Sequence, residues 1–295
     1  MRPMSLVIAH LGPRGTNTET VALAYADWLQ QTQGQTAQLL PYPSIGQTLH
    51  SAADPSIDVA IVPVENSTEG SIGVTLDTLW ERGNLQIQQE LVLPIIHVLL
   101  SHGRALEGLA KVYSHPQALG QCQKWLAQHL PQAELIATNS TSEAVQLIQQ
   151  DPTAAAIAAP RAAQLFEVPV LRAGINDYAD NCTRFWVVGR QPSHHGSHTA
   201  LAFTVPTNVP GALVHPLQAL AKRQINLCRI ESRPTKRSLG EYLFFMDLEA
   251  SQTDEHLQAA LAELEQYTEI LKLFGSYRVQ HLDPIQGTLA GQTNG

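Results

Sequence analysis

Three consecutive residues of different chemistry occur in the stretch NCTRFWVVGR, residues 181–190. Thr183 offers a hydroxyl, Arg184 a planar guanidinium and Phe185 an aromatic ring, directly ahead of an apolar run. An arginine in such a place can bind a carboxylate through two parallel hydrogen bonds. The combination suits the edge of a polar pocket better than a turn or a core, so it indicates a binding site.

Four other segments carry hydroxyl side chains where helices are expected to begin. Thr16, Ser114 and Ser140 are each followed three residues later by Glu or Gln, the spacing of a capping box. The fourth segment, ENSTEGSIG at residues 65–73, follows an apolar run and contributes Ser67. Each helix start follows a predicted strand, or a short linker behind one, and should lie near the carboxyl edge of a sheet. Ligands bind at that edge in open α/β folds.

The start of a helix attracts anions, because its first N–H groups lack partners and the helix dipole is positive there. A single capping box usually does no more than cap its helix. Four such starts, together with the triplet at Thr183, favour a pocket for a small anion with more than one carboxylate or phosphate. The GPRG loop by itself is weak evidence, since it lacks the lysine of a P-loop and the third glycine of a dinucleotide fold.

The first 190 residues alternate short apolar runs with segments whose apolar residues recur at helical spacing. This alternation predicts an α/β fold of parallel sheets with helices on their faces. Strands are expected at residues 5–11, 59–64, 95–101, 111–115, 154–159 and 183–189, and helices at 18–30, 118–130, 142–150 and after residue 73.

The pattern changes after residue 190. Residues 191–198 contain Pro, Gly, Ser and three histidines and predict a solvated linker; no metal site is expected, because no Asp, Glu or Cys lies nearby. Residues 199–280 follow the ferredoxin-like order βαββαβ. Pro216 should kink or shorten the first helix of this domain, which is expected to start at Pro210. Residues 281–295 are expected to form a flexible tail.

Composition narrows the class of partner. A net charge of −8 without a basic stripe argues against nucleic acid as a ligand. Three scattered cysteines predict reduced thiols in a reducing compartment. Because no stretch approaches the length of a membrane span or a signal peptide, a cytoplasmic protein without membrane contact is expected.

Eight short segments, in the same order, resemble the bacterial-type prephenate dehydratases with a C-terminal ACT regulatory domain. The segments are GPRGT, VPVENSTEGSI, SHPQALGQC, STSEAVQL, AAIAAPRAA, NCTRF, PGALVHPL and ESRP. Eight ordered blocks are far more specific than any one motif. The resemblance implies a two-lobed, periplasmic-binding-protein-like catalytic domain at residues 1–190, a linker at 191–198 and an ACT domain at 199–280. One departure is Asn17, where the family usually has an aromatic residue.

The family converts prephenate to phenylpyruvate, carbon dioxide and water on the way to phenylalanine. Aromatisation of the ring drives the reaction, so the resemblance implies no cofactor. It nominates Thr183 as hydrogen-bond donor to the leaving hydroxyl. Glu65 is the second candidate for the acid, if burial favours its protonated form, and His115, in the first turn of a helix, is expected to be structural. The residues implied in substrate binding are Thr16, Asn66, Ser67, Ser114, Gln121, Ser140, Thr141, Arg184 and Phe185.

The resemblance also implies feedback inhibition by L-phenylalanine and a homodimer or homotetramer formed through the ACT domains. The effector would bind two segments that face each other across a dimer interface. These are Gly211, Ala212, Leu213 and Val214 in the first and Glu231, Ser232, Arg233 and Pro234 in the second.

Two alternatives to a prephenate dehydratase stay open from the sequence. One is an arogenate dehydratase, with the same chemistry on a substrate that carries an amino group. The other is a non-catalytic amino-acid sensor, against which the intact Thr183 argues.

Overall fold

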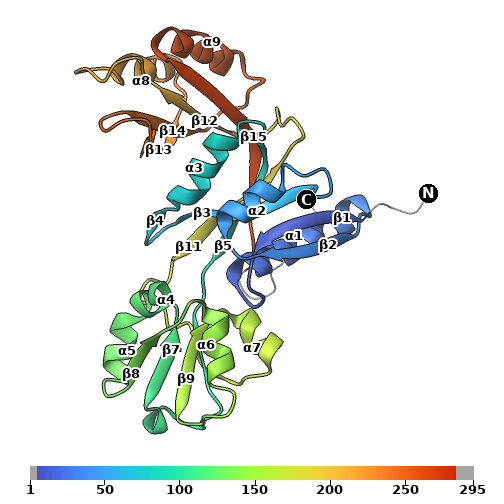
Figure 1. Cartoon of the computed structure of the whole chain (residues 1–295), viewed down its shortest axis with the longest axis vertical. Helices are drawn as coiled ribbons and strands as arrows, with labels where there is room; N and C mark the ends of the chain where they lie inside the picture. The colour runs from blue at the N-terminus through green and yellow to red at the C-terminus, as the bar shows by residue number, and fades with distance from the viewer. Residues whose placement is uncertain (1–4, 284–295) are drawn as a thin grey trace.

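The structure is a computed structural model that describes residues 5–283 of the chain. Three bodies follow one another along its long axis, with lobe I between lobe II and the C-terminal domain (Figure 1). Lobe I contains residues 5–94 and 182–189, lobe II residues 95–181, and the C-terminal domain residues 198–281. The chain therefore leaves lobe I once, after residue 94, and re-enters it at residue 182.

Lobe I is a mixed sheet in the order β5–β11–β3–β1–β2 with three helices. Its elements are β1 (Leu6–Leu11), α1 (Asn17–Gln33), β2 (Ala37–Tyr42), α2 (Ile45–Ser51), β3 (Val59–Asn66), β4 (Gly70–Ser71), α3 (Gly73–Arg82), β5 (Gln86–Pro94) and β11 (Cys182–Gly189). β1 is parallel to β2 and β3, but β11 is antiparallel to β3 and β5. The expected parallel pairing is confirmed for β1, β2 and β3, whereas β11 is antiparallel because the chain re-enters the sheet from lobe II between β5 and β3.

Lobe II has its own sheet, in the order β10–β6–β9–β7–β8. Its elements are β6 (Val98–Leu100), β7 (Lys111–Ser114), α4 (Pro116–Gln121), α5 (Gln123–His129), β8 (Glu134–Ala137), α6 (Thr141–Leu147), β9 (Ala154–Ala158), α7 (Pro160–Phe166) and β10 (Val170–Ala173). β7 is parallel to β8 and β9, whereas β6 is antiparallel to β9 and β10. The single helix expected at 118–130 is two helices, since Cys122 leaves helical geometry at φ −121° and ψ 15°.

The C-terminal domain confirms the predicted βαββαβ order. Its elements are β12 (His198–Thr204), α8 (Val214–Ala221), β13 (Leu227–Pro234), β14 (Tyr242–Leu248), α9 (Glu255–Leu264) and β15 (Ile270–His281). α8 is shortened, as expected from Pro216, and begins at Val214 rather than Pro210. Pro216 is thereby the third residue of the helix, where a missing N–H breaks no intrahelical bond.

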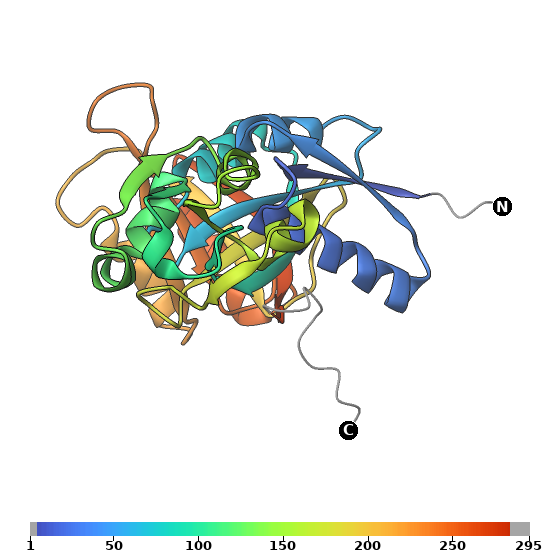
Figure 2. The ribbon, with the colours of Figure 1, turned by 90° about the horizontal axis from the view of Figure 1, so that it is seen from below.

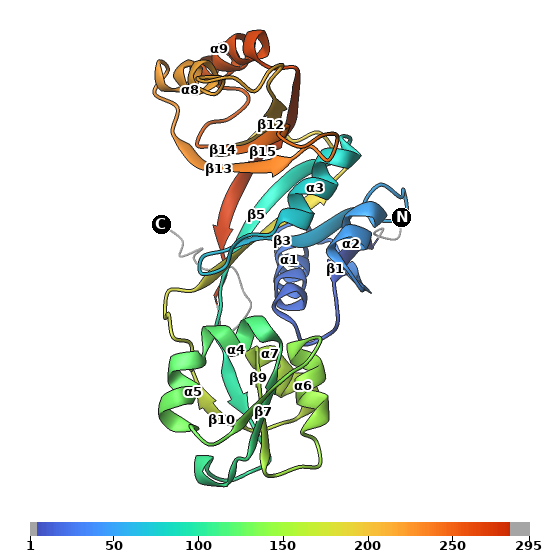
Figure 3. The ribbon, with the colours of Figure 1, turned by 60° about the vertical axis from the view of Figure 1, so that its left-hand side comes forward.

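Strand β15 belongs to two domains. Its first part pairs with β12, and residues 278–281 pair in parallel with residues 89–92 of β5, so one ten-stranded sheet runs through lobe I and the C-terminal domain (Figure 3). Leu282 is buried and donates its N–H to the Val92 carbonyl. The flexible tail predicted from residue 281 is therefore wrong for residues 281 and 282, and residues 284–295 lie outside the described chain.

Lobe I and the C-terminal domain also share a hydrophobic core. One buried cluster joins Trp186 and Val188 of β11 to Ala200, Phe245 and Tyr277 of the C-terminal sheet. The linker packs on the same junction, because the Ser193 hydroxyl donates to the Ser276 carbonyl and the Ser193 carbonyl accepts the Ser276 N–H. Most of residues 191–198 are nonetheless exposed to solvent, as the linker prediction requires. Every helix among residues 5–283 is too short or too polar to cross a bilayer.

Candidate active site

A cavity of about 780 Å³ lies between lobe I and lobe II. The loop after β1, the start of α1 and the ends of β3 and β11 line it from lobe I, and the starts of α4 and α6 line it from lobe II. Figure 2 views the molecule from the lobe II end. The predicted residues that line the cavity are Thr16, Asn66, Gln121, Ser140, Thr141, Thr183 and Phe185.

Thr183 is buried in the wall of the cavity. It is the second residue of strand β11, directly after the chain crosses over from lobe II. Its Oγ1 accepts a hydrogen bond of 2.9 Å from Asn66 Nδ2 on the neighbouring strand β3. Among residues 5–283, no acceptor takes the proton of the Thr183 hydroxyl. The hydroxyl proton is therefore free to be donated to a molecule in the cavity.

The orientation of the Asn66 amide is fixed by its other partners. Its Oδ1 accepts the backbone N–H groups of Thr68 at 3.0 Å and Glu69 at 3.1 Å, and backbone N–H groups can only donate. Nδ2 must then be the atom that faces Thr183 and the Asn181 Oδ1, at 2.8 Å. Asn66 thus keeps a donor on the Thr183 oxygen.

A chain of side chains from lobe II supports this pair. Gln121 Oε1 accepts from Asn181 Nδ2 at 3.0 Å and lies 2.7 Å from His97 Nε2. Because Gln121 Oε1 acts as an acceptor there, the His97 proton lies on Nε2. Burial lowers the pKa of His97, although the hydrogen bond to Gln121 opposes the shift. A neutral His97 at neutral pH follows.

Helix starts surround the rest of the cavity. Thr16 caps the 17-residue helix α1 by accepting from the Glu19 N–H, and Ser140 caps α6 by accepting from the Glu143 N–H. Asn17 and Thr18, the first residues of α1, line the cavity, and the first N–H groups of a helix have no intrahelical acceptor. His115 caps α4 with its ring nitrogen and also lines the cavity.

Two predicted hydroxyls have other tasks. Ser114 is the last residue of β7, fully buried, and donates to the Ile157 carbonyl at 2.7 Å, so the cap of α4 is one residue further on. Ser67 lies in the turn between β3 and β4 rather than at a helix start, and contacts Asn181 and the Cys182 N–H. Neither residue lines the cavity, so the structure does not bring them together with the other predicted site residues.

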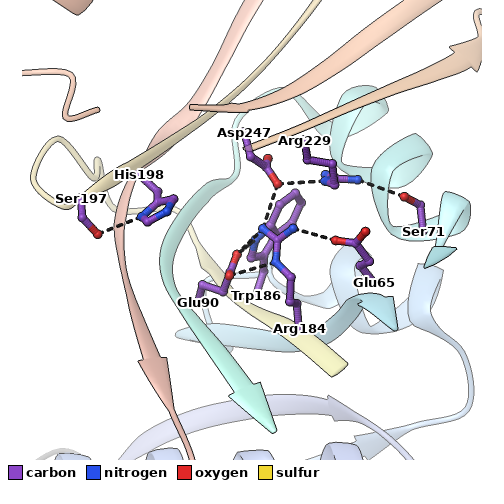
Figure 4. A network of polar contacts seen from close by, with 9 residues as sticks. All are labelled: Glu65, Ser71, Glu90, Arg184, Trp186, Ser197, His198, Arg229 and Asp247. Carbon is purple, nitrogen blue, oxygen red and sulfur yellow. Dashed lines mark hydrogen bonds and ion pairs between the residues drawn. The ribbon is translucent and has the colours of Figure 1, made fainter. Parts of the chain in front are cut away.

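Glu65 and Arg184 also lie outside the cavity, contrary to prediction. Successive side chains of a strand point to opposite faces, so Arg184 faces away from the side that carries Thr183 and Phe185. Its Nη1 lies 2.8 Å from Glu65, and Nε and Nη2 lie 2.9 Å and 2.6 Å from Glu90 of β5 (Figure 4). Arg184 therefore binds carboxylates of the protein itself.

The same arginine reaches the C-terminal domain. Arg184 Nη2 lies 2.8 Å from Asp247 of β14, whose Oδ2 also accepts from Arg229 Nε at 2.9 Å (Figure 4). Burial alone would raise the pKa of Asp247, but Arg229 and Arg184 outweigh it and hold that pKa below its usual value. An ionised carboxylate of the C-terminal domain thus binds Arg184, on the face of β11 that is turned away from the cavity.

The two segments expected to bind phenylalanine lie on different faces of the C-terminal sheet. Gly211 (φ +83°) belongs to the turn before α8, on the helical face. Glu231 is paired with Phe245, whose side chain packs towards lobe I, and Arg233 binds Asp77 of α3 at 3.0 Å. Within one chain, the side chains of Glu231 and Arg233 are therefore turned away from the Gly211 turn.

Two α/β lobes around a cavity that combines apolar walls with hydroxyl, amide and helix-start groups, with a ferredoxin-like domain attached, define a small-molecule enzyme or receptor with an appended regulatory module. Residues 8–193 match the family profile described as prephenate dehydratase, and residues 199–266 match the ACT domain profile. The chain belongs to the prephenate dehydratase family. It is a lyase of phenylalanine biosynthesis that converts prephenate to phenylpyruvate, and the alternative of a non-catalytic sensor is wrong.

Relatives match over most of the chain. A bifunctional chorismate mutase/prephenate dehydratase of Neisseria gonorrhoeae is 41% identical over 277 residues, which are 92% of this chain and 74% of that protein. The prephenate dehydratase of Lactococcus lactis is 35% identical over 284 residues, 93% of this chain and 98% of that protein. The structure of a prephenate dehydratase from Arthrobacter aurescens in complex with L-Phe has a TM-score of 0.81 at 32% identity and covers 98% of this chain and 94% of that one.

Of the side chains that support the Thr183–Asn66 pair, Asn181 and His97 were missed from the sequence, as were the cavity-lining residues Asn17 and Thr18. Asn181 stands two positions before Thr183, in the same NCTRF motif, and could have been found by its amide and its spacing. His97 follows an apolar run that carries no motif, and no signal in the sequence indicates its contact with Gln121.

Proposed function

We propose that Thr183 donates its hydroxyl hydrogen bond to the ring hydroxyl of prephenate as that group leaves. The observation that carries the proposal is the hydrogen bond from Asn66 Nδ2 to Thr183 Oγ1, which occupies the oxygen and leaves the proton available. A donor on the oxygen also polarises the O–H bond and strengthens its own donation. The leaving hydroxyl takes the Thr183 proton and departs as water, and a proton from solvent restores the Thr183 hydroxyl. The electron pair of the C–C bond to the ring carboxylate completes the aromatic ring as that bond breaks and carbon dioxide is released.

The two carboxylates of prephenate would be held by helix starts. Asn17 and Thr18 bring the open N–H groups of α1 to the cavity from lobe I, and Ser140 and Thr141 lie opposite on lobe II. Such N–H groups and the positive end of the helix dipole favour anions. Phe185 would form an apolar wall for the ring.

The exchange Thr183→Ala tests the role of the hydroxyl. We expect kcat to fall by ~10²–10⁴-fold, the usual contribution of a positioned proton-transfer group, with KM within a few-fold of the parent. Thr183→Ser keeps the hydroxyl and serves as the control with the larger remaining kcat. A near-normal kcat of Thr183→Ala in steady-state assays of phenylpyruvate formation would remove Thr183 from the mechanism.

The ACT domain supports regulation by L-phenylalanine, the ligand of the Arthrobacter aurescens relative. Val209, ahead of the Gly211 turn, is 51% exposed, Val214 at the start of α8 is 49% exposed, and Ile230 of β13 is 43% exposed. Such apolar exposure is what a hydrophobic effector or a second subunit would cover. The segment Glu231–Pro234 would complete the site from a second chain, because within one chain it does not meet the Gly211 turn.

This arrangement requires a homodimer, or a homotetramer of two such dimers. Strand β13 is an edge of the ten-stranded sheet and can pair with another copy. Light scattering of the purified protein distinguishes a monomer from these assemblies.

The three cysteines are free thiols, which supports a reducing, cytoplasmic location.

A further inference from the structure

The strands that carry Thr183 and Asn66 have a second pair of side chains on their other face. Thr183 is the register partner of Asn66, and the next residues, Arg184 and Glu65, are partners of each other. The first pair faces the cavity, and the second forms the 2.8 Å ion pair at the junction with the ACT domain. The two contacts are thus the front and the back of one short stretch of sheet.

The backbone ladder is irregular at this point. The register between β11 and β3 shifts directly after Arg184, so that Phe185 is opposite Pro63. A bulge disrupts the ladder locally, and bulges are common beside active sites. The position of Thr183 relative to Asn66 therefore depends more than usual on side-chain contacts, among them the ion pairs of Arg184 with Glu65 and Glu90.

Asp247 supplies the contact that comes from outside the catalytic domain. Its side chain is 1% exposed and lies 2.8 Å from Arg184 Nη2 and 2.9 Å from Arg229 Nε. Arg229 is an ACT residue that also reaches Ser71 Oγ of β4, at 3.3 Å (Figure 4). The Asp247 carboxylate thus connects to β11 through Arg184 and to β4 through Arg229.

We propose that Asp247 of the ACT domain is a positioning residue for the dehydratase reaction, acting through Arg184 on the Thr183–Asn66 pair. Asp247 does not line the cavity and touches no reacting atom. It restrains the guanidinium that ties β11 to β3 and β5, so its loss lets the Thr183 hydroxyl move relative to the leaving group. The proposal rests on the proposed role of Thr183.

The test compares Asp247→Asn, which keeps the size and removes the charge, with the matched control Thr199→Val. Thr199 is also a buried polar residue of the ACT sheet, with hydrogen bonds of 2.6 Å to Ala250 and Ser276, but it has no contact with Arg184. We expect Asp247→Asn to lower kcat about tenfold with KM nearly unchanged, as sub-ångström misplacement does, while Thr199→Val retains kcat. Both are assayed well below their melting temperatures.

A double-mutant cycle separates positioning from loss of folded enzyme. In the Thr183→Ala background, Asp247→Asn should have no further effect on kcat, because the group that it positions is gone. An equal fold-loss in both backgrounds, or a kcat equal to that of Thr199→Val, would overturn the proposal. If Asp247→Asn does not fold, Asp247→Glu keeps the charge but displaces the carboxylate, and the same comparisons apply. Should Thr183→Ala retain kcat, the role of Thr183 fails, and the comparison with Thr199→Val still decides whether Asp247 affects turnover.

Discussion

Neighbouring residues of β11 serve opposite sides of the molecule. Thr183 and Phe185 line the cavity, and Arg184 between them binds Glu65, Glu90 and Asp247. Arg184 was expected from the sequence to bind the substrate, but its side chain does not line the cavity. Arg184→Lys should therefore lower stability and kcat rather than raise KM.

The donor direction at Thr183 can be reversed by Asn66→Asp. A carboxylate has no N–H to donate, so it would accept the Thr183 proton and withhold it from the substrate. We expect kcat to fall about as far as in Thr183→Ala, by ~10²–10⁴-fold. Steady-state kinetics measure this, and Thr68→Val, which removes only an outer partner of Asn66, is the control. If the kcat of Asn66→Asp equals or exceeds that of Thr68→Val, Asn66 does not orient the Thr183 hydroxyl.

Acid should weaken the junction at Asp247. Because the pKa of Asp247 is lower in the folded protein than in the unfolded chain, its ionised form stabilises the fold. This stabilisation is complete above the pKa of an ordinary carboxyl group and is lost as the pH falls through the lowered pKa. Urea midpoints measured from pH 7 to pH 3 should fall more steeply in the parent than in Asp247→Asn. Identical pH dependence of the two proteins would contradict the assignment.

At the scale of elements, strand β15 joins two domains at a glycine. Gly275 has φ +112°, and an added Cβ would lie 2.9 Å from the carbonyl oxygen of Ile87. Gly275→Ala should lower the free energy of unfolding by about 1–3 kcal/mol, the usual cost of a forced backbone conformation. Denaturant titration measures it, with Gly108→Ala, which meets open space, as control. A stability equal to that of the control would mean that the backbone at residue 275 adapts freely to a side chain.

The sequence predicted elements with strong local signals and missed those that depend on pairing. Thr16 and Ser140 cap helices as their spacing indicated, but at Ser114 the same spacing was one residue out, because His115 is the cap. β5, with the polar stretch QIQQE, has no apolar alternation that marks a strand, and its partners β11 and β15 are distant in sequence. Both faces of β11 are covered, so residue type could not show which face Arg184 takes.

At the scale of the whole molecule, L-phenylalanine should inhibit turnover by binding the ACT domain. A coupling of about 1–3 kcal/mol would change activity or substrate affinity roughly 5–150-fold. Gly211→Val should relieve inhibition. Gly211 has a positive φ, and a side chain there would occupy the space beside the Gly211–Val214 turn where the effector is proposed to bind. Gly240→Val, at another positive-φ glycine of the same domain with open space around it, is the control. Calorimetry without binding heat for the parent protein would contradict the prediction.

Strand β15 has a further effect on how the protein can be divided. Residues 278–281 cover one side of β5, so cutting the chain at the linker would leave that side of the catalytic sheet without its partner. An uncovered strand of this kind offers a row of free N–H and C=O groups to the next molecule, and such rows promote aggregation. The catalytic lobes are therefore not an autonomous module that could exchange regulatory domains freely. A recombinant protein that keeps the lobes soluble must include residues 278–281 of β15.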